Sequence, residues 1–320
     1  MLSQPDLLTV FDGVLTGNTA GLPQDVTVKW THLSQVQIVE KMTALGCPVS
    51  RHLVKQMLEI RGFKKRTLLK DNELKVVEGR NEQFERIAAT REFFARNDLP
   101  QLSIDTKNKE LLGNFYRKGS TYCVEGQKVN DHDFASFAEG RLVPHGIYDL
   151  NDNTGYMTLG TSKDTSEFVC DNLRDCWLSH LQFKYPDAHT MLLLCDGGGS
   201  NSCLHHIFKQ DLLELANQLK INILVAHYPA YCSKYNPIEH RLFAQISHTW
   251  SGVPLRNIQF VKELTDTTTT KTGLQVISKI NLKTYESKRP ISDNFKNKVQ
   301  QLVIFDSDCP KWNYLIRHPN

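Results

Sequence analysis

The chain has 320 residues, of which 40% are hydrophobic and 23% are charged, and its formal net charge is +3. This length is enough for one large core and one small satellite domain. No apolar run approaches the ~20 residues that a membrane span needs, so the composition excludes a membrane-spanning protein. The mild positive charge permits a polyanionic partner such as DNA without requiring one.

The cysteines favour a reducing compartment. Eight of them are scattered along the chain without a C-x-x-C pair, and the N-terminal residues lack the pattern of a secretory signal. We therefore expect free thiols and a cytoplasmic location. A zinc site made of Cys195, Cys203, His205 and His206 is an alternative, but its spacing fits no common structural zinc pattern.

Two short helices are predicted near the N-terminus. Apolar residues recur at helical spacing over 33–45, and Ser34 with Gln37 forms a capping box. The sequence Gly46-Cys47-Pro48-Val49 then breaks the helix, and Ser50 caps a second one that has a single buried stripe. The pattern of helix, tight turn and helix is typical of a small all-α helix-turn-helix domain, which we assign to residues 1–74.

The second of these helices carries a basic, exposed face. Residues suited to contacting base edges lie on the helix and a cationic cluster follows it; they are Arg51, His52, Lys55, Gln56, Lys64, Lys65 and Arg66. Such a face is typical of a recognition helix that binds DNA. A solvated charged face on a simple packing unit is the alternative.

A change of character near Pro100 marks the second module. Residues 75–99 are charged and helical in pattern, and we interpret them as a linker helix. After them, residues 101–106 form a strand-like segment that ends at Asp105.

Strands and helices alternate in the second module. A turn at 151–155 joins two halves of a β-hairpin, a helix follows at about 165–181, and the apolar strand 191–195 ends at Asp196. A further helix, a short strand at 223–226 and a helix from Pro237 complete the pattern. We predict an α/β core over 100–252, with 253–320 as an extension packed on it.

Asp196 is followed by glycines that would expose its carboxylate at the end of the strand. A dinucleotide-binding loop is disfavoured because position 202 is serine, and the same serine breaks the pattern of a hydrolase nucleophile elbow. A capping role on the next helix is the structural alternative to a catalytic one.

Glu239 presents a similar choice. Asn236-Pro237-Ile238-Glu239 is a good helix start with Asn236 as cap. However, Glu239 shares a helical side with Phe243 and Ile246, where an uncompensated carboxylate is costly and a nearby cation would offset that cost.

Asp105, Asp196 and Glu239 together form an all-oxygen donor set, which suits Mg²⁺ or Mn²⁺. Two such ions in one site activate an attacking oxygen and stabilise a leaving one, so in-line phosphodiester chemistry is the natural use. Three basic residues flank these acids and are candidates for holding the phosphate backbone, with a solvated face as the alternative; they are Lys107, Lys234 and Arg241.

Several motifs spread over most of the chain resemble one family. They include Ser103-Ile104-Asp105-Thr106-Lys107, Pro144-His145-Gly146-Ile147-Tyr148-Asp149, Asp196-Gly197-Gly198-Gly199-Ser200-Asn201, Asn236-Pro237-Ile238-Glu239-His240-Arg241 and Trp312-Asn313-Tyr314. In these motifs the sequence resembles the ISAzo-type bacterial insertion-sequence DDE transposases, which are related to the mariner-like branch.

The resemblance implies an RNase H-like catalytic core whose acids fall on Asp105, Asp196 and Glu239. It also implies cleavage and strand transfer of double-stranded DNA at transposon terminal inverted repeats, target DNA as a second substrate, and a homo-oligomer assembled on DNA. In a bacterial cell such a protein would be associated with the nucleoid when bound to DNA. Two alternatives stay open: an inactive, truncated product that acts as a DNA-binding repressor, and an RNase H-like nuclease or resolvase.

Overall fold

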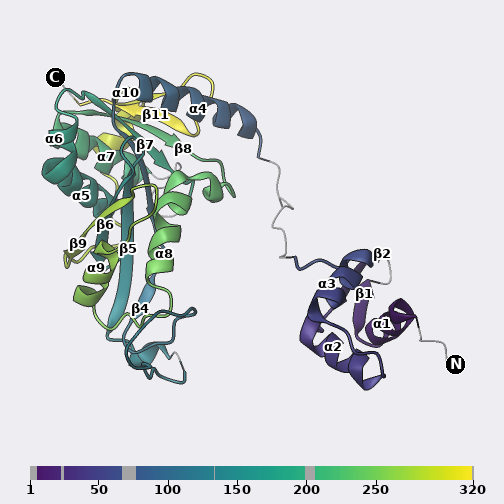
Figure 1. Ribbon diagram of the computed structural model, residues 1–320. Coiled ribbons are helices and arrows are strands. Elements are labelled where there is room, and N and C mark those ends of the chain that lie inside the picture. The colour runs from purple at the N-terminus through teal and green to yellow at the C-terminus, as the bar shows by residue number, and fades with distance from the viewer. Residues whose placement is uncertain (1–5, 23–24, 67–76, 133, 199–205, 319–320) are drawn as a thin grey trace. The chain divides into compact units, whose positions relative to one another are not determined.

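The computed structural model describes residues 6–22, 25–66, 77–132, 134–198 and 206–318 (Figure 1). The chain forms two compact units, Met1–Asn72 and Glu73–Asn320. The predicted boundary between residues 74 and 75 lies outside the described residues.

The N-terminal unit consists of three helices and a hairpin. Its elements are α1 (Leu7–Thr16), β1 (Thr19–Leu22), β2 (Asp25–Thr31), α2 (Gln35–Ala44) and α3 (Arg51–Ile60). The helices share a core that includes Phe11, Ile38, Met42 and Val54.

The predicted helix pair of this unit is confirmed together with its caps. Ser34 and Gln37 form both hydrogen bonds of the capping box, and the Ser50 side chain accepts from the backbone of Leu53. The prediction of an all-α unit was wrong, because β1 and β2 pair as an antiparallel hairpin. The alternation of residues in Asp25–Thr31, rich in valine and threonine, is the strand signal that the prediction overlooked.

The large unit is built on a mixed sheet. In its described residues the sheet has nine strands in the order β10-β11-β8-β7-β3-β5-β6-β9, with β4 paired to β5 outside this path. The bounds are β3 Gln101–Thr106, β4 Glu110–Leu112, β5 Gly140–Asp149, β6 Thr154–Gly160, β7 Thr190–Cys195, β8 Asn222–His227, β9 Gln275–Asn281, β10 Val303–Phe305 and β11 Asn313–Ile316.

The centre of this sheet has an RNase H-like topology. Strands β3, β5 and β6 are successive antiparallel neighbours, whereas β7 and then β8 lie parallel to β3 on its other side. The predicted fold class of the large unit, α/β with an RNase H-like core, is confirmed. Because β3, β6, β7 and β8 run in the same direction, their carboxyl ends meet at one edge of the sheet.

Helices cover both faces of the sheet (Figure 1). One face packs against α5 (Ser166–Cys176), a π-helical turn (Trp177–Leu181), α7 (His206–Leu219) and α10 (Asp293–Leu302). The short helix α6 (Gln182–Lys184) follows the π-helical turn and has no buried residues. The other face packs against the π-helical turn η5 (Glu239–Phe243), α8 (Ala244–Thr249) and α9 (Ile258–Asp266). Short 3₁₀ turns occur at η1 (Ala135–Phe137) and η4 (Ser233–Tyr235).

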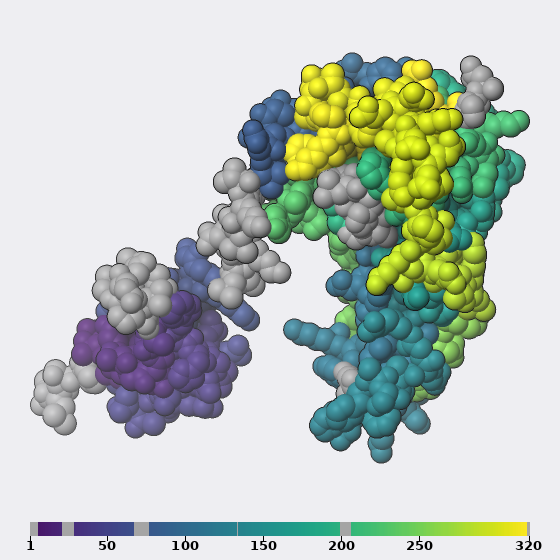
Figure 2. All heavy atoms as spheres, turned by 180° about the vertical axis from the view of Figure 1, so that it is seen from behind, coloured from purple at the N-terminus to yellow at the C-terminus, as the bar shows by residue number. Residues whose placement is uncertain are grey.

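The helix predicted as a linker is α4 (Arg80–Arg96), and it lies on the sheet of the large unit. Ile87 and Phe94 pack on Leu192 and Leu194 of β7, and the Gln83 amide donates to the backbone carbonyl of His227 at 2.9 Å. Figure 2 shows the blue surface of α4 beside the yellow C-terminal residues. The apolar positions of this helix therefore serve the core of the large unit.

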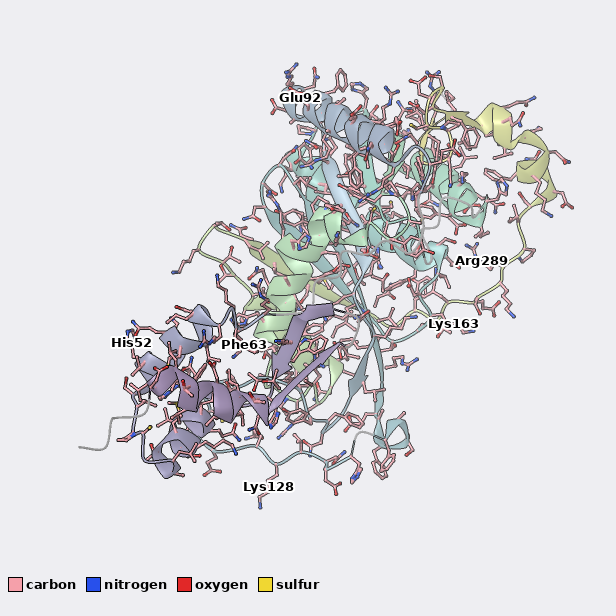
Figure 3. All side chains as sticks on the ribbon, turned by 90° about the vertical axis from the view of Figure 1, so that its right-hand side faces the viewer. His52, Phe63, Glu92, Lys128, Lys163 and Arg289 are labelled. Carbon is pink, nitrogen blue, oxygen red and sulfur yellow. The ribbon has the colours of Figure 1, made fainter. Side chains whose placement is uncertain are left out.

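The C-terminal residues contribute strands to the sheet. β9 forms one edge beside β6, and at the other end of the sheet β11 pairs with β8 and β10 forms the edge beside β11. Between them the chain passes Arg289, which is labelled in Figure 3. Residues 253–320 therefore include structural members of the sheet and not only an extension packed on it.

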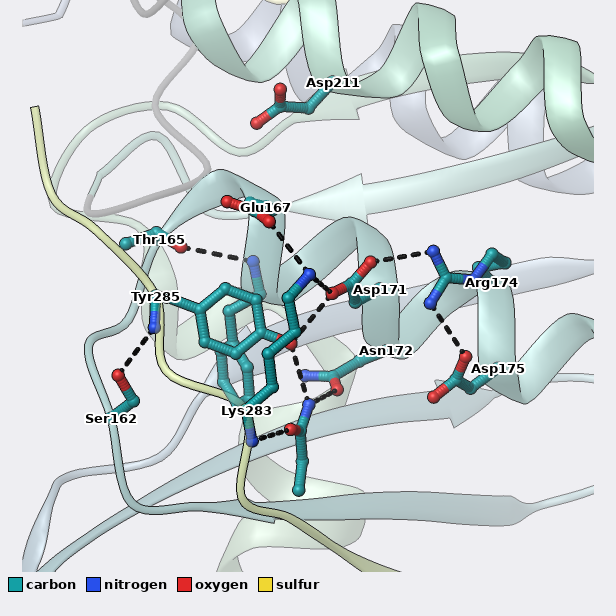
Figure 4. Close-up of polar contacts among 12 residues, drawn as sticks. Ser162, Thr165, Glu167, Asp171, Asn172, Arg174, Asp175, Asp211, Lys283 and Tyr285 are labelled. Carbon is teal, nitrogen blue, oxygen red and sulfur yellow. Dashed lines mark hydrogen bonds and ion pairs between the residues drawn. The ribbon is translucent and has the colours of Figure 1, made fainter. Parts of the chain in front are cut away.

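A polar network fastens the segment after β9 to α5 (Figure 4). The Lys283 ammonium group lies 2.7 Å from Asp171 and 2.9 Å from Glu167, and the Tyr285 hydroxyl donates to Asp171 at 2.9 Å. Arg289 reaches Asp211 on α7 at 2.5 Å. These contacts tie the C-terminal segment to the helical layer. Among the helices described here, none is long and apolar enough to cross a membrane.

Candidate active site

Two of the predicted acids end neighbouring parallel strands. Ile104 of β3 pairs with Cys195 of β7, so Asp105 and Asp196, the next residue on each strand, emerge side by side at the carboxyl edge of the sheet. Both side chains are partly buried. The strand register therefore brings together two carboxylates that are far apart in the sequence.

A buried histidine holds the backbone of Asp196. His227 Nδ1 lies 3.0 Å from the carbonyl oxygen of Asp196, and its Nε2 lies 3.1 Å from the Tyr314 hydroxyl. Burial lowers the pKa of His227 to about 4, so the ring is neutral at physiological pH. Because a carbonyl only accepts, Nδ1 carries the hydrogen and Tyr314 donates to Nε2. The C-terminal strand β11 thus supports the end of β7.

Glu239, the third predicted acid, is the first residue of η5, which packs on the sheet opposite β5 and β6. The close packing requires glycine beneath the helix. A Cβ atom on Gly146 would lie 2.6 Å from the Phe243 ring, and one on Gly155 would collide with Leu242. These glycines therefore allow Glu239 to approach the edge of the sheet where Asp105 lies.

The charges of the three acids influence one another. Burial, and then repulsion from Asp196 and Glu239, raise the pKa of Asp105 to about 8, although the Thr106 N–H donates to its carboxylate at 2.7 Å. Burial and repulsion from Glu239 and Asp164 also raise the pKa of Asp196. The fold therefore groups Asp105, Asp196 and Glu239, as predicted, into a cluster of like charges.

The three carboxyl groups have the chemistry of a divalent-cation site. All donors are carboxylate oxygens, the set that Mg²⁺ or Mn²⁺ prefers, and the raised pKa values indicate negative charge that the protein leaves uncompensated. In the described part of the chain, no three Asp, Glu, His or Cys side chains already form a set that could hold a metal ion. The donor atoms therefore suit a divalent cation, but the three acids would have to close around the ion to bind it together.

A fourth carboxylate, absent from the predicted site, lies at the same edge. Asp164 follows β6 and accepts a hydrogen bond from the Thr106 hydroxyl at 3.2 Å. It also contributes to the raised pKa of Asp196. The sequence contained a signal for it, because an acid just after a strand parallel to β3 must reach the carboxyl edge.

Asp196 and Asn236 were also considered as caps of the helices that follow them. The Asp196 carboxylate accepts from the Gly198 N–H at 3.4 Å, a local turn contact. Residues 199–205, where a helix capped by Asp196 would begin, lie outside the described residues. Asn236 does not cap η5 as the sequence suggested. Its side chain is directed to β3, where it bonds Ser103 and the carbonyl of Ile104.

The basic residues near the acids differ in their availability. Lys107 is only 10% exposed, lies 3.4 Å from Glu110 and stacks over the Trp250 ring at 5.0 Å. Its charge is therefore engaged within the protein, which argues against the predicted role in holding the phosphate backbone. Lys234 and Arg241 are exposed.

In the N-terminal unit, all of the predicted DNA-contact residues are exposed; they are Arg51, His52, Lys55, Gln56, Lys64, Lys65 and Arg66. Figure 3 labels His52 on α3. Arg61 is bound instead to Asp12 of α1 at 2.6 Å. That pair joins two helices and leaves the predicted face of α3 accessible.

The zinc alternative finds little support. Cys203 and His205 lie outside the described residues. Cys195 is fully buried in the sheet, and burial keeps its thiol pKa well above the usual value, which disfavours the thiolate that zinc would need.

The fold and the site define a class: an α/β protein with an RNase H-like core that gathers acidic side chains at the carboxyl edge of its sheet. The sequence model of a family described as Rhodopirellula transposase DDE domain matches residues 11–318. The chain belongs to this family of DDE transposases, and the predicted resemblance is confirmed.

Other comparisons give weaker similarities. No curated protein matches the chain. Among solved structures, the Mos1 mariner paired-end complex with Mn has 18% sequence identity and a TM-score of 0.47, covering 82% of this chain and 72% of that one. The Mos1 strand transfer complex has 17% identity and a TM-score of 0.45, with coverages of 82% and 70%.

Proposed function

We propose that this transposase cleaves DNA at the terminal inverted repeats of a transposon and transfers the cut strand to target DNA, using Asp105, Asp196 and Glu239 as catalytic acids. The observation that carries the proposal is the convergence of these carboxyl groups at one edge of the sheet, where burial and then repulsion from the other acids raise the pKa of Asp105 to about 8. Such a strongly perturbed acidic cluster is typical of a functional site.

The roles of the residues follow from their positions. Asp105 and Asp196 would hold Mg²⁺ or Mn²⁺ between two strand ends, and Glu239 would complete the site from the facing helix. Two bound ions supply activation of the attacking oxygen and stabilisation of the leaving oxygen. The attacking oxygen belongs to water in cleavage and to a DNA 3′-hydroxyl in strand transfer, so the acids serve both steps.

DNA recognition is proposed for both units. In the N-terminal unit, the exposed face of α3 would bind the terminal repeat, with Arg51, His52, Lys55 and Gln56 directed at base edges. The cluster Lys64, Lys65 and Arg66 would contact the phosphate backbone, as would the exposed Lys234 and Arg241 beside the acids. Assembly as a homo-oligomer on DNA, and a cytoplasmic location at the nucleoid, belong to the same proposal.

One substitution tests the assignment of the acids. Asp196→Asn keeps the shape of the side chain and removes its charge, so we expect loss of Mg²⁺-dependent strand cleavage with DNA affinity nearly intact. Asp175→Asn is the control, because Asp175 lies on α5, is bound to Arg174 and Lys279, and should leave cleavage unchanged when it is replaced. Cleavage by Asp196→Asn at the normal rate would exclude the proposed site.

A further inference from the structure

Ser103 is a buried hydroxyl on the strand that carries Asp105. It lies two residues before Asp105 on β3, and because side chains alternate along a strand the two share one face of the sheet. Ser103 is fully buried. Its position indicates a role for the hydroxyl close to the acids.

Asn236 meets Ser103 from the other direction. It lies three residues before Glu239, its side chain is fully buried, and its amide oxygen accepts from the Ser103 hydroxyl at 2.5 Å. Its amide nitrogen donates to the backbone carbonyl of Ile104, the residue next to Asp105, at 3.3 Å. Asn236 therefore links the backbone next to Asp105 to the segment that leads into Glu239.

The Ser103 hydroxyl also caps the helix that carries Glu239. The backbone N–H of Ile238 donates to the Ser103 oxygen at 3.1 Å, whereas η5 receives no side-chain cap at its own first residue. Free N–H groups at a helix start require partners when they are buried. Here the partner comes from a strand of the sheet, so the start of the helix is fixed to β3.

We propose that Ser103 and Asn236 form a clasp that sets the separation of the Asp105 and Glu239 carboxylates and thereby the affinity of the site for divalent metal. Ser103 and Asn236 are positioning residues, since neither is one of the acids. This inference rests on the proposed function of the acids as metal ligands.

The directionality of the clasp is the physical reason for this role. Apolar side chains of similar size would fill the same space without fixing an orientation. The three hydrogen bonds fix both the orientation of the helix start relative to β3 and its distance from that strand. Partners that orient metal ligands typically contribute about 10- to 100-fold in metal affinity or activity. The clasp orients the backbone that bears two ligands at once.

The test uses the metal-free, full-length protein and measures Mn²⁺ binding by electron paramagnetic resonance. Ser103→Ala removes the hydroxyl, and we expect the Kd for Mn²⁺ to rise about tenfold or more. Asn236→Ala should produce a comparable rise, and the double variant should bind little worse than either single variant, because each one already breaks the clasp.

Ser278→Ala is the matched control. Ser278 is also a buried, hydrogen-bonded serine on a strand of the same sheet. However, it bonds Asp266 on α9 and lies on β9, the outermost strand on that side of the sheet. Its loss should lower the melting temperature without weakening Mn²⁺ binding. If Ser103→Ala does not fold, Asn236→Ala carries the same comparison.

The outcomes separate this inference from the proposed function. A Kd within twofold of the wild type in the clasp variants, or an equal rise in Ser278→Ala, overturns the clasp while Asp196→Asn still abolishes Mn²⁺ binding. If Asp196→Asn binds Mn²⁺ as tightly as the wild type, the metal site itself is misassigned and the clasp proposal is overturned with it.

Discussion

The buried charge of Asp105 predicts how the stability of the metal-free protein depends on pH. The folded protein raises the pKa of Asp105 from 3.8 to about 8, so folding retains a proton that the unfolded chain releases. The stabilisation is fully present below about pH 4 and is lost as the pH rises through 8. Within this window, one proton changes the free energy of unfolding by about 1.4 kcal/mol per pH unit.

Asp105→Asn removes that proton linkage. We compare the free energies of unfolding of the variant and its parent in EDTA. As the pH rises from 5 to 8, the difference should shift by roughly 3 to 4 kcal/mol in favour of the variant, because the parent loses the stabilisation from the Asp105 proton and asparagine does not titrate. Added Mg²⁺ at pH 8 should stabilise the parent more than the variant, because the cation offsets a charge that the variant lacks.

Urea unfolding followed by tryptophan fluorescence provides the measurement. A Trp30→Phe background removes the tryptophan of the N-terminal unit, so the signal comes from Trp177, Trp250 and Trp312 in the large unit. Asp175→Asn serves as the control with no expected change of slope. If the stabilities of Asp105→Asn and its parent run parallel from pH 5 to pH 8, Asp105 is not the buried, repelled carboxyl group described here.

Three further predictions concern the supports of the site and the DNA-binding face. Tyr314→Phe leaves the buried His227 Nε2 without its donor, so it should cost about 1 to 3 kcal/mol in urea unfolding and slow cleavage; unchanged stability would contradict a supporting role for this hydrogen bond. Replacing Lys64, Lys65 and Arg66 by glutamine should lower the slope of log affinity against log salt by about 0.9 for each phosphate that the protein no longer neutralises, and an unchanged slope would exclude the cluster from the interface. Arg51→Ala should relax the preference for terminal-repeat DNA over scrambled DNA, and an unchanged preference in a competition assay would remove it from the reading face.

The acids were predictable because their signals are local. Asp105 lies near the end of β3 and Asp196 directly follows the apolar strand β7, and parallel strands place such residues at one edge regardless of their distance in the chain. The role of Glu239 was harder to predict, because Asn236-Pro237-Ile238-Glu239 is also the pattern of an ordinary helix start. The packing of η5 on Gly146 and Gly155, together with the hydrogen bond from Ile238 to Ser103, directs it to that edge.

The supports of the site were not predictable in the same way. The bonds from Ser103 to Asn236 and from Tyr314 to His227 join residues more than 80 positions apart, and their side chains carry no periodic signal. The helix α4 was misread for a related reason. Its charged surface suggested a linker, because the apolar residues that pack it on β7 are few and widely spaced.

Cleavage of the repeats that flank the parent element tests the central proposal most directly. Wild-type protein and Asp196→Asn are incubated with Mg²⁺ and a duplex that carries either the terminal inverted repeat or a scrambled sequence. We expect wild type alone to cut, at the repeat end, leaving a 3′-hydroxyl that joins to target DNA. Equal cutting of both duplexes would indicate a nuclease without repeat specificity, and binding without any cutting would indicate a repressor; either result would contradict an active transposase.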